Sequence, residues 1–141
     1  MGTFWSTEKH LLDQLKELAN EYMGVTAYSY YYQDQYPMIK KIREWTKKNH
    51  PKFADYRSQA YMQNFLTMQI FIECLRRADK SGAITGDSLA KALESIKNYD
   101  VGGLMLPVTI SKNHSIPVGR IMRGNAKTLK FDPVSDWISL D

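Results

Sequence analysis

The apolar residues change their spacing close to Gly102-Gly103, and this change limits the folds that the chain can adopt more than any other feature. Before that point, apolar residues recur at intervals of three and four, which is typical of amphipathic helices. After it, short β-rich segments follow one another. Helices are therefore predicted over 7–20, 37–48 and 62–79 and from Thr85 or Asp87 onward, and β-rich segments over 105–110, 116–123 and 127–131.

A further segment, Val25 to Tyr32, is rich in β-branched and aromatic residues, which favour an extended strand over a helix. The dipeptide Gly124-Asn125 predicts a hairpin turn between the last two β-rich segments. The resulting order is a helix, a strand, three helices and a β-rich tail. This order predicts an α/β fold rather than an all-α or an all-β fold.

The composition is that of an ordinary folded domain. The chain has 141 residues, of which 43% are hydrophobic and 24% charged, so it can bury a substantial core. No apolar run is long enough for a transmembrane helix. No basic segment followed by an apolar one opens the chain, so no secretory signal is expected within it. The single cysteine, Cys74, lies among apolar positions of the third helix and is expected to fill core space.

The net charge of +4 raises the question of nucleic-acid binding. The densest basic stretch runs from Lys40 to Lys52, and helical spacing places its charges on the side away from the apolar stripe. A solvated helix face accounts for this pattern. No zinc-finger, RNP-like or helix-turn-helix motif accompanies it, so the sequence predicts no nucleic-acid partner.

The sequence contains no pattern for catalysis or metal binding. The three histidines, His10, His50 and His114, lie far apart, and no pair has the spacing of metal ligands. No nucleophile elbow, phosphate-binding loop or dinucleotide-binding motif is present. We therefore expect no catalytic residue, no metal and no cofactor, and a chain that is not an enzyme.

Aromatic side chains gather in two places, at Phe4-Trp5 and between Tyr28 and Tyr32. On a strand, Tyr28, Tyr30 and Tyr32 would share one face. Tyrosine and tryptophan combine apolar area with a hydrogen-bonding tip, which suits a small-molecule cleft. The same rings also suit a core or an interface, and the residues alone leave these alternatives open.

Several stretches, taken in order, resemble one known family. They are Gly2-Thr3-Phe4-Trp5-Ser6 before a helix, Gly24-Val25-Thr26 before the tyrosines, Tyr61 to Ala78, Leu89 to Glu94, Tyr99 to Leu104, Pro107 to Ser111, and Pro133 to Ile138. Together they are similar to the C-terminal portion of a branched-chain amino-acid type substrate-binding protein of an ABC transporter. The resemblance covers nearly the whole chain and rests on the order and spacing of the stretches.

The resemblance implies a partial type I periplasmic-binding-protein fold, with helices packed on a mostly parallel sheet and a β-rich C-terminal tail. In this family two α/β lobes joined by three crossovers enclose the ligand, so the chain is expected to be a C-terminal fragment. By similarity, residues 1–24 belong to the second lobe, 25–32 form a crossover, 33–100 belong to the first lobe, and 101–141 form a crossover and the β-rich tail. Such a fragment leaves apolar surface uncovered, so self-association of the isolated chain is expected.

The resemblance also indicates which residues contact the ligand. These are Thr3, Phe4, Trp5 and Ser6 in a cleft-facing loop, Tyr28 and Tyr30 near a crossover, and Tyr61 near the start of a first-lobe helix. Leucine-binding members carry a glutamate at the position of Thr3 or Phe4, whereas this chain has no acidic residue before Glu8. The solute is therefore left open between an aliphatic amino acid and an aromatic, amide-like or otherwise different compound.

The function that the resemblance implies is periplasmic or otherwise extracytoplasmic capture of an amino acid or similar small solute. The solute would bind the closed form better than the open form, and the closed form would deliver it to the membrane permease of an ABC importer. Two other functions stay open: a ligand-sensing domain of a receptor or regulator, and a free-standing interaction module without a transport function.

Overall fold

The computed structural model of the chain describes residues 1–110, 113, 116 and 118–139, with Phe4 described by its backbone alone. Ser111, His114 and residue 117, which the sequence-based predictions include, lie outside the described residues. The helices and strands are η1 (Phe4–Ser6), α1 (Lys9–Leu15), η2 (Lys16–Glu21), β1 (Met23–Thr26), α2 (Pro37–Asn49), η3 (Pro51–Phe53), α3 (Gln59–Lys80), α4 (Gly86–Glu94), β2 (Val118–Asn125), β3 (Lys130–Pro133) and β4 (Ile138–Ser139).

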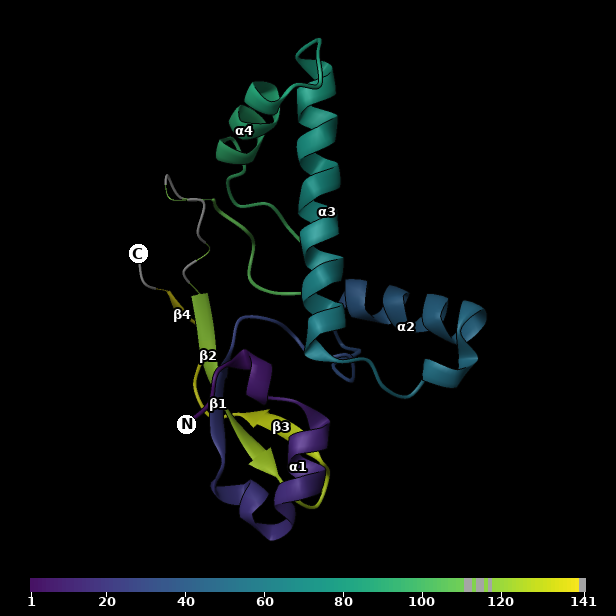
Figure 1. Cartoon of the computed structure of the whole chain (residues 1–141), viewed down its shortest axis with the longest axis vertical. Helices are drawn as coiled ribbons and strands as arrows, with labels where there is room; N and C mark the ends of the chain where they lie inside the picture. The colour runs from purple at the N-terminus through teal and green to yellow at the C-terminus, as the bar shows by residue number, and fades with distance from the viewer. Residues whose placement is uncertain (111–112, 114–115, 117, 140–141) are drawn as a thin grey trace.

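The chain folds into two units that surround separate apolar cores (Figure 1). The strand unit contains residues 1–26 and 118–139, and its core is formed by Leu12, Ala19, Tyr30, Met122 and Phe131. The helix unit contains residues 33–110, and α2, α3 and α4 surround its larger core. Residues 27–32 connect the two units. This mixture of helices and sheet confirms the predicted α/β class.

The sheet lies in the strand unit, and its strands are antiparallel. β2 pairs with β1, β3 and β4, and every one of these pairings is antiparallel. The prediction of a mostly parallel sheet is therefore wrong for the described strands; the parallel pairing found there is an isolated bridge between Gly2 and Gly24. For β2 and β3 the physical reason is the hairpin in the C-terminal tail, because two strands joined by a short turn must run in opposite directions.

The predicted hairpin exists, but its turn lies beyond Gly124-Asn125. These two residues end β2 and pair with Phe131 and Lys130. The Asn125 side-chain oxygen accepts hydrogen bonds from the backbone N–H groups of Lys127 and Thr128, both at 3.1 Å. An Asx-type contact of this kind stabilises a turn directly after the asparagine.

The strand predicted over 25–32 ends at Thr26, so the prediction is wrong for the remainder. The backbone N–H of Ser29 donates to the Leu104 carbonyl at 2.7 Å, and that of Tyr30 donates to the Gln33 side chain at 2.7 Å. Tyr30 packs in the core of the strand unit, whereas Tyr31 packs in the core of the helix unit. The segment therefore passes between two cores instead of joining a sheet.

The helices follow the predicted periodicity more closely. α2, α3 and α4 lie where they are expected, with the side chains of Ser58 and Thr85 accepting cap hydrogen bonds at the starts of α3 and α4. The first predicted helix divides into α1 and the 3-10 helix η2. The prediction of a β-rich segment over 105–110 is wrong, because these residues form no strand. They contribute one isolated bridge, between Val108 and Tyr99.

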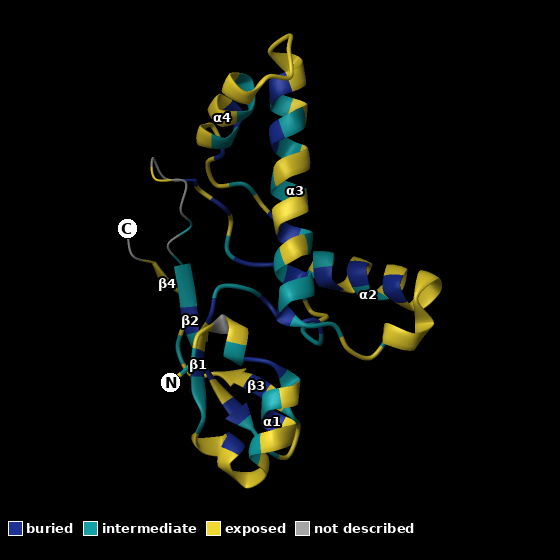
Figure 2. Ribbon diagram, viewed as in Figure 1, coloured by how far each residue is buried: buried dark blue, intermediate teal, exposed yellow. Residues whose placement is uncertain are grey.

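α3 is apolar on two opposite faces. Met62, Leu66 and Cys74 are buried in the helix unit, whereas Met68 and Ile72, on the opposite side by helical periodicity, are 53% and 44% exposed. Figure 2 shows that α3 carries both buried and exposed positions along its length. A large apolar patch on a helix is normally covered by another element or by a partner. Neither α3 nor another helix in the described residues combines the length and apolar character that a membrane span requires.

We expect the isolated chain to self-associate through this outer face of α3, because burying it removes apolar surface from water. Sedimentation velocity should show a species that grows with concentration. Replacing Met68 by glutamate should shift the population toward monomer, whereas Thr67→Glu, on a polar exposed position of the same helix, should change it little. A compact monomer at every concentration would contradict this expectation.

Candidate functional site

The two units meet at a junction to which each contributes polar residues. η1 lies against α3 (Figure 1), and Glu8, the residue before α1, contacts Tyr56 and, at the start of α3, Gln59. The connecting residues 27–32 pass beside this region. In a protein of two units, such a junction is the natural place for a ligand that both units contact.

Glu8 links the two units through its buried carboxylate. Its side chain belongs to the strand unit and is 8% exposed. Oε1 accepts a hydrogen bond from the backbone N–H of Gln59 at 2.6 Å, and Oε2 accepts one from the Tyr56 hydroxyl. Burial, together with this hydrogen bond to the carboxylate, raises the pKa of Tyr56. The tyrosine therefore stays neutral and remains a donor.

A cavity of about 180 Å³ lies beside this carboxylate, with walls from both units. Its lining includes Glu8, Tyr30, Tyr32, Asp55, Tyr56 and Phe131. The aromatic rings are stacked: the Tyr30 centroid lies 5.0 Å from that of Tyr32 and 5.8 Å from that of Phe131. The Tyr32 hydroxyl donates to the Phe131 carbonyl at 2.7 Å, which fixes the connecting segment against β3. The cavity is therefore mainly apolar, with carboxylates at its edge.

Two polar side chains beside Glu8 are deeply buried. They are the Tyr30 hydroxyl, on a residue that is 6% exposed, and the side-chain amide of Gln59, which is 2% exposed. Burial raises the pKa of Tyr30 to about 12, and side-chain hydrogen bonds with Thr7 and Gln59 oppose this increase. Polar atoms this deeply buried ordinarily have partners.

Arg120, on β2, contacts Gln33, directly after the residues that connect the two units. The side chain is 6% exposed, and its guanidinium lies 4.6 Å from the centroid of the Trp137 ring. Nη2 donates to the Gln33 side-chain oxygen at 3.3 Å, and the same oxygen accepts from the backbone N–H of Tyr30. A buried cation stacked on an aromatic ring is well suited to hold one conformation of this segment.

The structure divides the predicted ligand-contact residues among several places. Thr3 is exposed, Trp5 is 63% exposed, and Ser6 Oγ accepts from the Tyr22 hydroxyl at 2.7 Å. Thr3 directly precedes η1 (Phe4–Ser6), the element that contacts α3. Tyr28 is half-buried against the core of the helix unit, and burial raises its pKa. Tyr30 lines the junction cavity.

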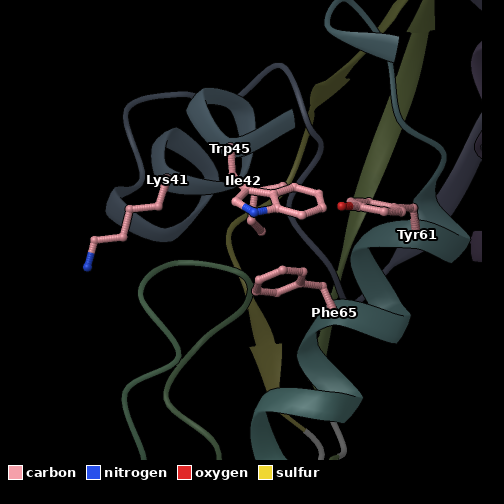
Figure 3. A pocket seen from close by; sticks show the side chains of 5 residues that line it. All are labelled: Lys41, Ile42, Trp45, Tyr61 and Phe65. Atoms are coloured by element: carbon pink, nitrogen blue, oxygen red, sulfur yellow. The ribbon is translucent and has the colours of Figure 1, made fainter. Parts of the chain in front are cut away.

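Tyr61 lines a second cavity, of about 410 Å³, between α2 and α3. Figure 3 shows the rings of Trp45, Tyr61 and Phe65 around this space. The guanidinium of Arg57 lies 4.6 Å from the centroid of the Tyr61 ring. Tyr61 and Tyr30 therefore belong to different cavities, and the structure does not bring all the predicted residues together.

Sequence reasoning missed Glu8, Tyr56 and Gln59 as members of the site. Tyr56 and Gln59 lie 48 and 51 residues from Glu8. No local pattern reports a contact over such a separation. The sequence signal for this site is the cluster of tyrosines around Tyr30, because Tyr30 lines the cavity.

The described residues thus form two units with separate cores, joined by a crossing segment and with a cavity between them. A family model described as "Periplasmic binding protein" matches residues 3–126, so this chain belongs to the periplasmic binding protein family. Members of this family bind solutes and are not enzymes. No match is found among curated proteins.

Two solved structures share the fold. One is described as a branched chain amino acid ABC transporter from Thermus thermophilus with bound valine; it has a TM-score of 0.81 and 19% identity, and 98% of this chain aligns with 38% of that one. The other is described as an ABC transporter permease from the Pseudomonas fluorescens group, with a TM-score of 0.78 and 18% identity over 99% of this chain and 37% of that one. The chain thus has a partial type I periplasmic-binding-protein fold and spans less than two fifths of these relatives.

Proposed function

We propose that this chain is part of an extracytoplasmic solute-binding protein that captures an amino acid or a similar small solute between two lobes and delivers it to an ABC importer. The observation that carries the proposal is the cavity beside Glu8, which is lined from both units. Family membership supports an extracytoplasmic location. The bound valine in the Thermus thermophilus structure supports an amino acid as the solute class.

In this proposal, residues 1–24 belong to the second lobe, 25–32 form a crossover, 33–100 belong to the first lobe, and 101–141 form a crossover and the tail. The separate cores of the two units support the division. Tyr30 and Tyr31 support the crossover, because adjacent residues pack in different cores. A solute bound between the lobes stabilises the closed arrangement, and the permease then recognises the closed form.

The test is a calorimetric screen of amino acids and their amides against the complete protein, combined with small-angle X-ray scattering. We expect at least one solute to bind and to reduce the radius of gyration, because closure brings the lobes together. Failure to bind any of them, with no compaction, would contradict solute capture.

The loop Thr3–Ser6 gives a separate prediction for the complete protein. Trp5 is 63% exposed and belongs to η1, which contacts α3. We expect Trp5→Ala to weaken solute binding by more than about tenfold, since an aromatic contact residue carries much of the affinity of a small site. Leu18→Ala, at a residue that is 69% exposed on η2, is the control and should leave the dissociation constant unchanged. An unchanged constant for Trp5→Ala would remove this residue from the site.

A further inference from the structure

The positive charge of this chain is concentrated in one part of the helix unit. Residues 37–57, which contain α2 and η3, carry seven lysines and arginines and two carboxylates, a net charge of +5, whereas the whole chain carries +4. Five lysines of this segment are exposed: Lys40, Lys41, Lys47, Lys48 and Lys52. Among the residues that the structure describes, none of these five forms an ion pair. Their charges are therefore available to an anionic partner.

Two large aromatic side chains are exposed in the same segment. Trp45, on α2, is 52% exposed, and Phe53, on η3, is 54% exposed. Lys41, Trp45 and Lys48 are spaced by four and three residues, so they lie on one side of α2. Exposed aromatic rings beside lysines are the combination that lies at the interface between a lipid bilayer and water.

Ring contacts join Trp45 and Phe53 into one continuous surface. Trp45 and Tyr61 line the same cavity between α2 and α3 (Figure 3). The guanidinium of Arg57 lies 4.6 Å from the centroid of the Tyr61 ring and 4.6 Å from that of Phe53. The Trp45 ring lies 5.1 Å from the ring of His50. These contacts hold the exposed rings in place before a partner binds.

This surface projects from the rest of the molecule. In Figure 1, α2 extends sideways from the lower part of α3, and no other described element reaches as far in that direction. Figure 2 shows that the end of α2 and the η3 turn after it are exposed. A flat surface can therefore approach the end of α2 from that side without meeting the strand unit.

The arrangement of the rings favours a lipid surface over a nucleic acid. Stacking of a base requires an open ring face. One face of Phe53 lies against the Arg57 guanidinium, and the Trp45 ring lies next to His50 at an interplanar angle of 55°. At a bilayer, a ring needs only to reach the headgroup region, and the flexible lysine side chains bring their ammonium groups to the phosphates.

We propose that the corner formed by Trp45, Phe53 and the lysines Lys41, Lys48 and Lys52 binds the surface of an anionic phospholipid bilayer. The lysines contact the headgroup phosphates, and the two rings enter the interfacial region. Because salt screens charges over about 10 Å, the binding is reversible and depends on salt. This inference goes beyond the proposed function: the corner is separate from the cavity between the two units, and it places the chain beside a membrane.

The experiment is co-sedimentation of the 141-residue chain with vesicles of phosphatidylcholine alone and with vesicles of phosphatidylcholine and phosphatidylglycerol in equal amounts. We expect binding to the anionic vesicles to be at least about tenfold tighter at low salt, and most of this difference to disappear at high salt. A sample without vesicles corrects for self-association. Single-stranded oligothymidylate, titrated at the same salt, tests the nucleic-acid alternative.

Variants with matched controls locate the binding surface. Lys52→Glu should weaken binding to anionic vesicles by about tenfold or more, whereas Lys127→Glu, with the same change of charge at an exposed position of the strand unit, should weaken it by about threefold or less. Trp45→Ala should weaken binding by about fivefold or more, because the ring no longer enters the interface. Leu18→Ala, at an exposed residue of η2, should leave it unchanged.

Tryptophan fluorescence gives a second measurement of the same contact. Emission should shift to shorter wavelength when the chain binds anionic vesicles, and Trp45→Phe should lose most of this shift while it keeps an aromatic ring and most of the affinity. Circular dichroism establishes that the variants fold. Equal binding to both kinds of vesicle, no binding to either, or unchanged affinity in Lys52→Glu or in Trp45→Ala overturns the proposal. Tighter binding of oligothymidylate than of anionic vesicles also overturns it, and none of these results contradicts solute capture.

Discussion

Replacing Phe131 with alanine should destabilise the strand unit by about 3–5 kcal/mol, the usual cost of emptying a buried phenylalanine site. Phe131 is 2% exposed and lies in the small core of this unit. Its ring stacks on Tyr30 and lies edge-on to Tyr22, with a centroid distance of 6.2 Å to Tyr22. Few other side chains are available to close the resulting space, so the loss should be near the upper end of the range.

Hydrogen exchange measured along the chain distinguishes a local effect from a global one. Phe131→Ala should increase exchange in β1, β2 and β3 far more than in α3, because the helix unit has its own core. Ile42→Ala is the matched variant, since Ile42 is 2% exposed in the other core, and it should produce the opposite pattern. Equal loss of protection in both units for each variant would show that the chain unfolds as one cooperative unit.

Gly124→Ala should also be strongly destabilising, by about 1–3 kcal/mol or more, because no space exists for the added methyl group. A Cβ atom at Gly124 would overlap the backbone carbonyl oxygen of Ala19 and lie 2.7 Å from Leu12 Cδ2. The clash with backbone cannot be relieved by a rotamer change, and moving η2 would break the contact between the Gly124 N–H and the Tyr22 carbonyl, now 2.9 Å.

Gly86→Ala is the control for this substitution. A Cβ atom at Gly86 meets no other atom within 4 Å, and the residue is in the first turn of α4. Alanine there should be neutral or should stabilise the chain by up to about 1 kcal/mol, because it restricts the unfolded state. Urea denaturation gives the comparison, and similar midpoints for the two variants would contradict the close packing of η2 on β2.

Local sequence patterns predict the positions of the main helices of this protein. Apolar spacing and end signals are properties of neighbouring residues, so Pro37 at the start of α2 and Thr85 at the start of α4 are informative from the sequence alone. The strand prediction over 25–32 is wrong beyond Thr26 because β-propensity describes a side chain's fit to a sheet surface. Residues 27–32 have the composition of a strand but lie between two cores.

The candidate site also depends on contacts between residues far apart in the sequence, which local patterns do not predict. Aromatic density points to Tyr30, which lines the junction cavity, and to Tyr61, which lines another one. Glu8 follows two small hydroxyl residues and has no neighbour in sequence that marks it as buried. Its partners are Tyr56, in the segment before α3, and Gln59, the first residue of α3, and their approach depends on how the two units pack.

Short-range spacing and the order of segments are enough to predict the positions of the main helices, the α/β class, the hairpin at the end and the resemblance to a binding-protein family. Other features depend on the packing of the two units: the antiparallel pairing of β2 with β1, the separation of Tyr30 and Tyr31 into different cores, and the burial of Glu8 against Gln59. They depend on contacts between residues far apart in the chain, which form only when the chain folds back on itself and the two units pack against each other.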